Sequence, residues 1–153
     1  MNGSTIAMMP AVTRRLVILA MFGPSMYATH AAAAPCAAGA GFYTPAQAKA
    51  GLAGYNANCA SCHNTDLLGN SGPALSGGKF ASYVNFTKIT PTQLLAFTSS
   101  QMPANAPGTL SAADYDNIFA YILSYDKYPP GTQPVSADGM SCLSLLPYPG
   151  ATD

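Results

Sequence analysis

The sequence contains few charged residues, and no glutamate is among them. Charged side chains account for 8% of the 153 residues, and every acidic residue is an aspartate. No basic patch is present that would hold the phosphates of a nucleic acid, so we expect no nucleic-acid partner. Long-range electrostatic steering of protein partners should also be weak, because it depends on such charges.

The chain also lacks an apolar run long enough for a membrane-spanning helix. Arg14 and Arg15 precede an apolar run at 16–22, which Gly23 and Pro24 interrupt, and alanines follow at 31–34. A spanning helix needs about 20 apolar residues. A basic start, a short apolar run and small residues are typical of a secretory signal peptide. We therefore predict a signal peptide at 1–33 that is cleaved on export to the periplasm.

No strand pattern of any length appears, and three segments carry helix signals instead. Each starts with a threonine or serine cap and has a glutamine or aspartate three residues later. The predicted helices span 45–58, 91–100 and 112–126. Apolar spacing predicts the buried residues of the second and third helices, which are Leu94, Leu95 and Phe97, and Tyr115, Ile118, Phe119 and Ile122.

Two further segments lack helix signals. Residues 64–86 are rich in glycine, serine and asparagine, so we expect a loop with one short helical turn near 80–83. From Pro129 onward, five prolines rule out a long helix. We expect residues 129–153 to form an extended tail on the surface. The chain is therefore predicted to be all-α, with one helical domain at 34–128 followed by this proline-rich tail.

The four cysteines form two sets. Cys36 and Cys142 lie near the two ends of the exported chain, where an oxidising compartment favours a disulfide between them. Two free thiols are the alternative. Cys59 and Cys62 are separated by two residues, and His63 follows directly in the stretch NCASCHN.

Three kinds of chemistry can use this stretch. A zinc site needs about four protein ligands, whereas Cys59, Cys62 and His63 are three at most. A thioredoxin-like dithiol would follow a strand in a βαβ unit, which this chain lacks. Haem attachment explains the spacing, because two thiols about one helical turn apart can bond the porphyrin vinyl groups while the adjacent histidine ligates iron. We predict one covalently attached haem c.

The sixth iron ligand is expected to be a methionine, because His63 is the sole histidine after the signal peptide. The exported chain has two methionines, Met102 and Met140. Met102 lies in the loop after the second predicted helix, just before Pro103. Met140 is two residues from Cys142, and pairing of Cys142 with Cys36 would hold the tail away from the distal face. We therefore favour Met102 as the ligand and expect Met140 to fill the core or lie on the surface.

These features together resemble a mono-haem class I cytochrome c, over about 42–128. Cys59–His63 is the haem motif, and Gly51 and Tyr55 stand where the family places a glycine and an aromatic on its first helix. Residues 72–75 (GPAL), 102–103 (MP) and 118–121 (IFAY) resemble its Gly-Pro-x-Leu loop, its distal-ligand loop and its last helix. The resemblance implies a small fold of three main helices around one haem.

The resemblance also implies the site. His63 and Met102 would ligate the iron, and the carbonyl of Pro73 would accept a hydrogen bond from the other nitrogen of His63. The chain departs from many relatives because it has no tryptophan to lie near the inner haem propionate. Tyr43, Tyr83 and Lys79 are the candidates to replace it. The tail that carries Cys142 is a second departure.

By this resemblance, the function is electron transfer rather than enzymatic catalysis. The segments at 72–80 and 102–123 are similar to cytochromes that serve periplasmic dehydrogenases, so electrons would pass from a dehydrogenase toward the respiratory chain. Expected partners are a dehydrogenase, a terminal oxidase or another cytochrome, and a stable place in a membrane-associated complex also fits. Two alternatives stay open. One is a haem enzyme or gas sensor with an open sixth position, and the other is a subunit whose haem only completes the fold.

Overall fold

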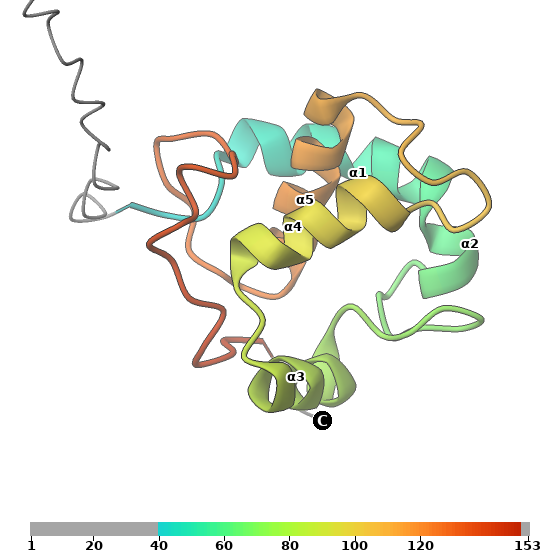
Figure 1. The fold of residues 1–153 in the computed structure, drawn as a ribbon, viewed down its shortest axis with the longest axis horizontal. Coiled ribbons are helices and arrows are strands. Elements are labelled where there is room, and N and C mark those ends of the chain that lie inside the picture. The colour runs from blue at the N-terminus through green and yellow to red at the C-terminus, as the bar shows by residue number, and fades with distance from the viewer. Residues whose placement is uncertain (1–39, 151–153) are drawn as a thin grey trace, which may run out of the picture. The chain divides into compact units, whose positions relative to one another are not determined.

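The computed structural model describes residues 40–150, which contain five α-helices and no β-strand (Figure 1). The all-α prediction is confirmed for this part of the chain. The predicted signal peptide and Cys36 lie outside the described residues. No helix within 40–150 has the length and hydropathy needed to cross a membrane. The helices are α1 (Pro45–Asn58), α2 (Ala60–His63), α3 (Gly77–Thr87), α4 (Pro91–Gln101) and α5 (Ala112–Tyr125).

Helices α1, α4 and α5 begin where the sequence predicts, because each has a local cap. Thr44 and Thr90 each form a capping box with the glutamine three residues later, and proline occupies the first helical turn. The Ser111 hydroxyl accepts a hydrogen bond from the N–H of Asp114. The ends of α4 and α5 lie within one residue of the predicted ends.

Helices α1 and α5 cross at close range, and glycine makes the approach possible. A Cβ atom built at Gly51 would lie 1.8 Å from the carbonyl oxygen of Asn117 on α5. One turn further along α1, the Tyr55 side chain is fully buried, and its ring centroid lies 5.2 Å from that of Tyr121. Gly51 and the rings of Tyr55 and Tyr121 therefore pack at the crossing of α1 and α5, and they belong to the helix segments that resemble the cytochrome family.

Gly51→Ala should lower the free energy of unfolding by about 3 kcal/mol, because the added methyl group meets backbone that cannot move without separating the helices. Gly54→Ala is the matched control on the same helix. Its Cβ would meet only side-chain atoms of Ile118, at 3.0 and 3.2 Å, and no backbone atom of α5. Alanine also favours the helix over glycine by about 1 kcal/mol, which offsets the cost of this contact. The stability of Gly54→Ala should therefore stay near that of the wild type. Urea unfolding measures the free energy of unfolding of both variants. Equal losses of stability in the two would show that α1 and α5 do not cross as closely as described.

The buried faces of α4 and α5 agree with the sequence prediction except at Leu94, which is only partly buried, and at Phe97. All four predicted residues of α5 are buried, and so is Leu95 of α4. Phe97, predicted to be buried, is instead 52% exposed. Because residues two positions apart point to different sides of a helix, burial of Leu95 turns Phe97 toward solvent.

Helix α3 is much longer than the short turn that the sequence predicts. It spans 11 residues and buries Phe80, Ala81 and Val84. The sequence signal is weak because the helix starts with two glycines and the Ser76 side chain makes no capping hydrogen bond. A residue far along the chain supplies the missing partner, because the hydroxyl of Tyr148 accepts a hydrogen bond from the N–H of Gly77 at 2.9 Å.

Three residues of the tail beyond Pro129 lie in the core, which corrects for them the prediction that the tail lies on the surface. Val135, Met140 and Leu145 are each at most 2% exposed, and they pack with residues of α1, α3, α4 and α5. The tail is also tied to the start of α1, where the N–H of Val135 donates to Oε1 of Gln47 at 2.8 Å. In Figure 1 this segment, coloured red, runs from beside the start of α1 to α3.

Candidate functional site

Cys59, Cys62 and His63 lie on one short turn that directly follows α1. Cys59 is both the C-cap of α1 and the N-cap of α2. Its carbonyl oxygen accepts hydrogen bonds from the N–H groups of Cys62, at 3.1 Å, and His63, at 3.0 Å. Both thiols are free, with Cys59 partly buried and Cys62 exposed, while His63 is buried. Helical geometry therefore brings the two sulfurs and the imidazole onto adjacent positions of one turn.

The loop after α2 holds the His63 ring in place. Nδ1 of His63 lies 2.7 Å from the carbonyl oxygen of Pro73. A carbonyl can only accept, so Nδ1 carries the proton that is donated, and in the neutral imidazole the free lone pair is then on Nε2. This is the tautomer that a metal-ligating histidine needs when it binds through Nε2.

Gly72 supports the same ring from one side. A Cβ atom at this position would lie 2.9 Å from Cε1, 3.0 Å from Nδ1 and 3.2 Å from Nε2 of His63. The N–H of Gly72 also donates to the carbonyl oxygen of Cys62 at 2.9 Å. The backbone at Gly72 thus packs against the imidazole, and any side chain there would displace the ring.

Backbone hydrogen bonds close the loop between His63 and Ser76 on itself. Gly69 donates to the His63 carbonyl at 3.0 Å, and Leu75 and Ser76 both donate to the Leu67 carbonyl, at 2.7 and 3.1 Å. Leu67 is fully buried beside Tyr55, whose hydroxyl donates to the Asn64 carbonyl at 2.7 Å. Sequence reasoning missed Leu67 and the Tyr55 hydrogen bond, because a buried leucine within a polar, glycine-rich stretch carries no periodic signal.

The two thiols differ in reactivity. Burial, together with the neighbouring Cys62 thiol, raises the pKa of Cys59 to about 11. Hydrogen bonds from Ser71 and Ser61 lower the pKa of the exposed Cys62 thiol. Because the thiolate is the nucleophile, Cys62 is the more reactive sulfur of the pair.

Met102 lies at the end of α4, apart in the sequence from Cys59, Cys62 and His63. It is the C-cap of α4 and is half-buried. Its carbonyl oxygen accepts hydrogen bonds from the hydroxyl of Tyr115 and from the N–H of Gly108, so α5 fixes its backbone. No hydrogen bond among residues 40–150 links this loop to His63 or Pro73. Met102 therefore stays a predicted ligand. Met140 is 1% exposed within the core, where it packs with Val135 and Leu145.

The three residues proposed to replace a tryptophan have different environments. The hydroxyl of Tyr43 donates to the carbonyl oxygen of Tyr128 at 2.9 Å, so it holds the start of the tail. Tyr83 is 46% exposed and stacks on Phe80. Lys79 lines a hollow of about 990 Å³ between the start of α3 and the loop at Leu68. Unlike the Tyr43 hydroxyl, the Tyr83 hydroxyl and the Lys79 ammonium group make no hydrogen bond to backbone among the described residues.

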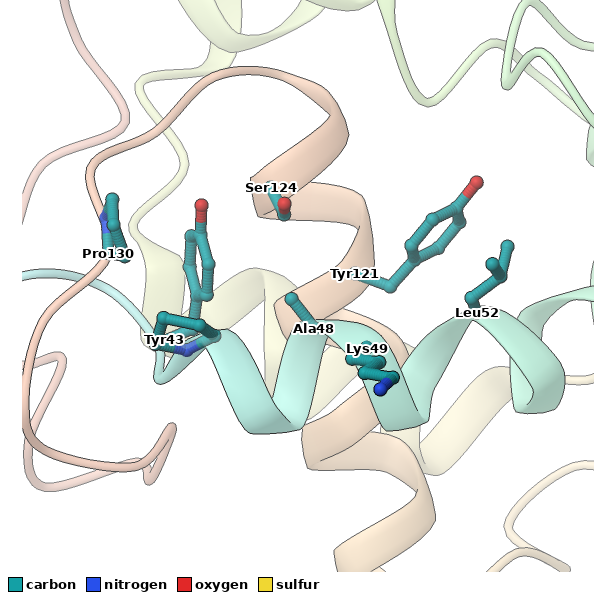
Figure 2. A pocket seen from close by; sticks show the side chains of 8 residues that line it. Tyr43, Ala48, Lys49, Leu52, Tyr121, Ser124 and Pro130 are labelled. Carbon is teal, nitrogen blue, oxygen red and sulfur yellow. The ribbon is translucent and has the colours of Figure 1, made fainter.

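A separate groove lies on the outer side of the α1–α5 crossing (Figure 2). It has a volume of about 430 Å³, and the side chains of Leu52 and Tyr121 lie together at one end of it. The predicted haem ligands are not among the residues that line it, so we do not assign it to the candidate site. Its lining residues are Tyr43, Pro45, Ala48, Lys49, Leu52, Tyr121, Ser124 and Pro130.

The donor set of the site fits a covalently attached haem. Two free thiols on one turn match the two vinyl groups, and a buried imidazole with Nδ1–H already bonded presents Nε2 for iron. The described residues contain no cluster of three or more histidine, cysteine or acidic side chains that could hold a bare metal ion.

Comparisons with known proteins agree with a cytochrome c fold. A model of the family described as cytochrome c oxidase, cbb3-type, subunit III matches residues 46–122. The solved structure of the sulfane dehydrogenase SoxCD from Paracoccus pantotrophus is similar in fold, with a TM-score of 0.52 and 22% sequence identity. The match covers 68% of this chain and 54% of that chain, so this chain spans about half of its length. No curated protein matches.

Proposed function

Because the chain belongs to the cytochrome c family described as subunit III of cbb3-type cytochrome c oxidase, we propose that it is a one-electron carrier with a single covalently attached haem c. The main support is the placement of Cys59, Cys62 and His63 on one turn, with Nδ1 of His63 bonded to Pro73. A haem c bound here would supply an iron that alternates between Fe(III) and Fe(II).

Each residue of the site has a separate task in this proposal. The sulfurs of Cys59 and Cys62 would form the thioether bonds, and Nε2 of His63 would ligate the iron. Pro73 and Gly72 fix the orientation of the imidazole, so the ring need not move when the protein gains or loses an electron. The sulfur of Met102 would be the second iron ligand, and α5 holds the Met102 backbone through Tyr115.

The proposed setting is the periplasm. The signal peptide at 1–33 would direct export, and an oxidising compartment would allow Cys36 and Cys142 to form a disulfide. The electron donor would be a periplasmic dehydrogenase, and the acceptor a terminal oxidase or another cytochrome. The similar fold within a sulfane dehydrogenase structure supports a redox enzyme as partner. We place residues 34–128 in the haem domain and 129–153 in its tail.

Met102→Ala tests the proposal. The exported wild-type protein should show the methionine–iron charge-transfer band when oxidised and should not bind carbon monoxide when reduced. The variant should lose the band and bind carbon monoxide, because its sixth position is open. Its reduction potential should also fall, because a thioether ligand raises the potential. Absorption spectra with and without carbon monoxide measure both properties.

Met140→Leu is the matched control, since it replaces the buried methionine of the tail with a side chain of similar volume. It should keep the wild-type spectra. If the wild-type protein itself binds carbon monoxide readily, the electron-carrier proposal is wrong and the haem enzyme or gas sensor replaces it.

A further inference from the structure

The start of α3 depends on a residue from the tail. Ser76 makes no capping bond, and the hydroxyl of Tyr148 accepts from the N–H of Gly77 at 2.9 Å instead. The same hydroxyl lies 3.5 Å from Oγ of Ser76. Tyr148 therefore takes the place of a local N-cap, and it comes from 71 residues further along the chain.

Asp126 holds this tyrosine. The Tyr148 hydroxyl donates to Oδ1 of Asp126 at 2.8 Å. Asp126 is fully buried, and its Oδ2 has no hydrogen-bond partner. It is also the C-cap of α5, where the negative end of the helix dipole opposes a carboxylate. A buried carboxyl with one unsatisfied oxygen is costly in its ionised form, so this position is suited to binding a proton.

The Asp126–Tyr148 pair is connected to the loop that orients His63. Ser76 and Leu75 donate to the Leu67 carbonyl, and Pro73, which accepts the His63 hydrogen bond, lies three residues before Ser76. The backbone at 73–77 is thus held at one end by His63 and at the other by Tyr148. A change in the hydrogen bond between Tyr148 and Asp126 can therefore shift the backbone segment that carries the Pro73 carbonyl.

We propose that Tyr148 is a positioning residue for the His63 loop and that proton binding at Asp126 is coupled to the gain of an electron by the protein. This inference rests on the proposed electron-carrier function. The electron comes from the reduced partner, and the proton comes from solvent and forms an O–H bond on the Asp126 carboxylate. Ionised Asp126 strengthens the hydrogen bond from Tyr148, and its buried negative charge opposes the addition of an electron.

The groups that face Asp126 come from three segments. They are Tyr148 of the tail, Ser76 before α3, and Lys127 and Tyr128 after α5. Burial raises the pKa of Asp126 to about 6, against the opposing effects of the hydrogen bond from Tyr148, the nearby Ser76 hydroxyl and the Lys127 charge. The carboxyl is therefore neutral below about pH 6 and negative above it.

The raised pKa of Asp126 fixes the direction in which pH changes the reduction potential and the stability. The reduction potential should fall as the pH rises through about 6, because the negative charge on Asp126 favours the oxidised protein. The folded protein also binds the Asp126 proton more tightly than the unfolded chain, whose aspartates titrate near pH 4. This contribution to stability is complete below about pH 4 and is lost as the pH rises through about 6.

The first experiment compares the reduction potential of the haem-loaded wild type and Asp126→Asn between pH 4.5 and 8. The wild-type potential should fall through a step near pH 6, and the step should be missing from Asp126→Asn. Asp116→Asn is the control, because burial also raises the pKa of that carboxyl on α5, yet no described hydrogen bond ties it to the tail. It should keep the step. Parallel curves for the wild type and Asp126→Asn would overturn the inference.

The second experiment uses Tyr148→Phe, which keeps the carboxyl and remains informative if Asp126→Asn does not fold. Loss of a hydrogen bond that lowers the Asp126 pKa should move the step to higher pH. The amide of Gly77 should also exchange with solvent at least tenfold faster in the reduced protein, as followed by NMR. Tyr125→Phe is the control, because this tyrosine is 38% exposed on α5 and its hydroxyl makes no hydrogen bond among the described residues. An unmoved step and unchanged Gly77 exchange would contradict the role of Tyr148.

Failure of the underlying function has a different outcome. Protein exported with no covalent haem, or with no reversible one-electron couple, would overturn both proposals. A normal couple whose potential shows no dependence on Asp126 would overturn only this inference and would leave the electron carrier intact.

Discussion

Gly72→Val should prevent His63 from taking the position that it has in the structure. The first carbon of the new side chain would lie 2.9–3.2 Å from three atoms of the imidazole ring, which is too close for van der Waals contact. The ring would have to rotate, and rotation would break the hydrogen bond between Nδ1 and the Pro73 carbonyl. The effect should be on the ligand rather than on the backbone, because Gly72 does not have a positive φ angle.

The expected result is a loss of correctly ligated haem protein by about 10- to 100-fold, the range usual for removing a group that orients a metal ligand. Absorption spectra of the exported protein measure the six-coordinate fraction, and its reduction potential reports the change in ligation. Asn70→Val is the matched control, since it introduces the same side chain at an exposed position of the same loop. If Gly72→Val and Asn70→Val give the same spectra and potential, the packing of Gly72 on His63 does not govern ligation.

Replacing the buried residues of the tail should remove most of the stability of the fold. Leucine-to-alanine and methionine-to-alanine changes in a core cost about 2–5 kcal/mol each. Val135, Met140 and Leu145 are at most 2% exposed, so the triple alanine variant should lose an amount similar to the total stability of a typical domain, about 5–15 kcal/mol. We expect this variant to be unfolded or nearly so at room temperature.

Point substitutions are preferable to truncation here, because they keep Cys142 and any disulfide that it forms. Guanidinium unfolding followed by circular dichroism measures the loss, and each single variant should show part of it. Gln133→Ala is the control, because this residue lies in the same segment and is exposed. An unchanged unfolding midpoint in the triple variant would show that the tail is a surface addition after all.

The sequence alone predicts the features that depend on residues close to one another in the chain. The capping residues Thr44, Thr90 and Ser111 place the starts of α1, α4 and α5 within their own first turns. The spacing of the apolar residues on α5 identifies its buried face. Likewise, Cys59, Cys62 and His63 share one turn because they are neighbours in the chain. Their roles as haem ligands, and that of Met102, stay predictions of the motif.

Only the tertiary structure decides the length of α3 and the place of the tail. The N–H of Gly77 finds its partner in Tyr148, and α3 lacks the local cap that the other long helices have. A proline-rich segment reads as a surface loop, yet burial of Val135, Met140 and Leu145 depends on the space that α1, α3, α4 and α5 leave between them. Periodicity and caps report interactions between near neighbours, whereas these contacts join residues dozens of positions apart. Their energy comes from packing and buried hydrogen bonds that exist only once the helices have assembled.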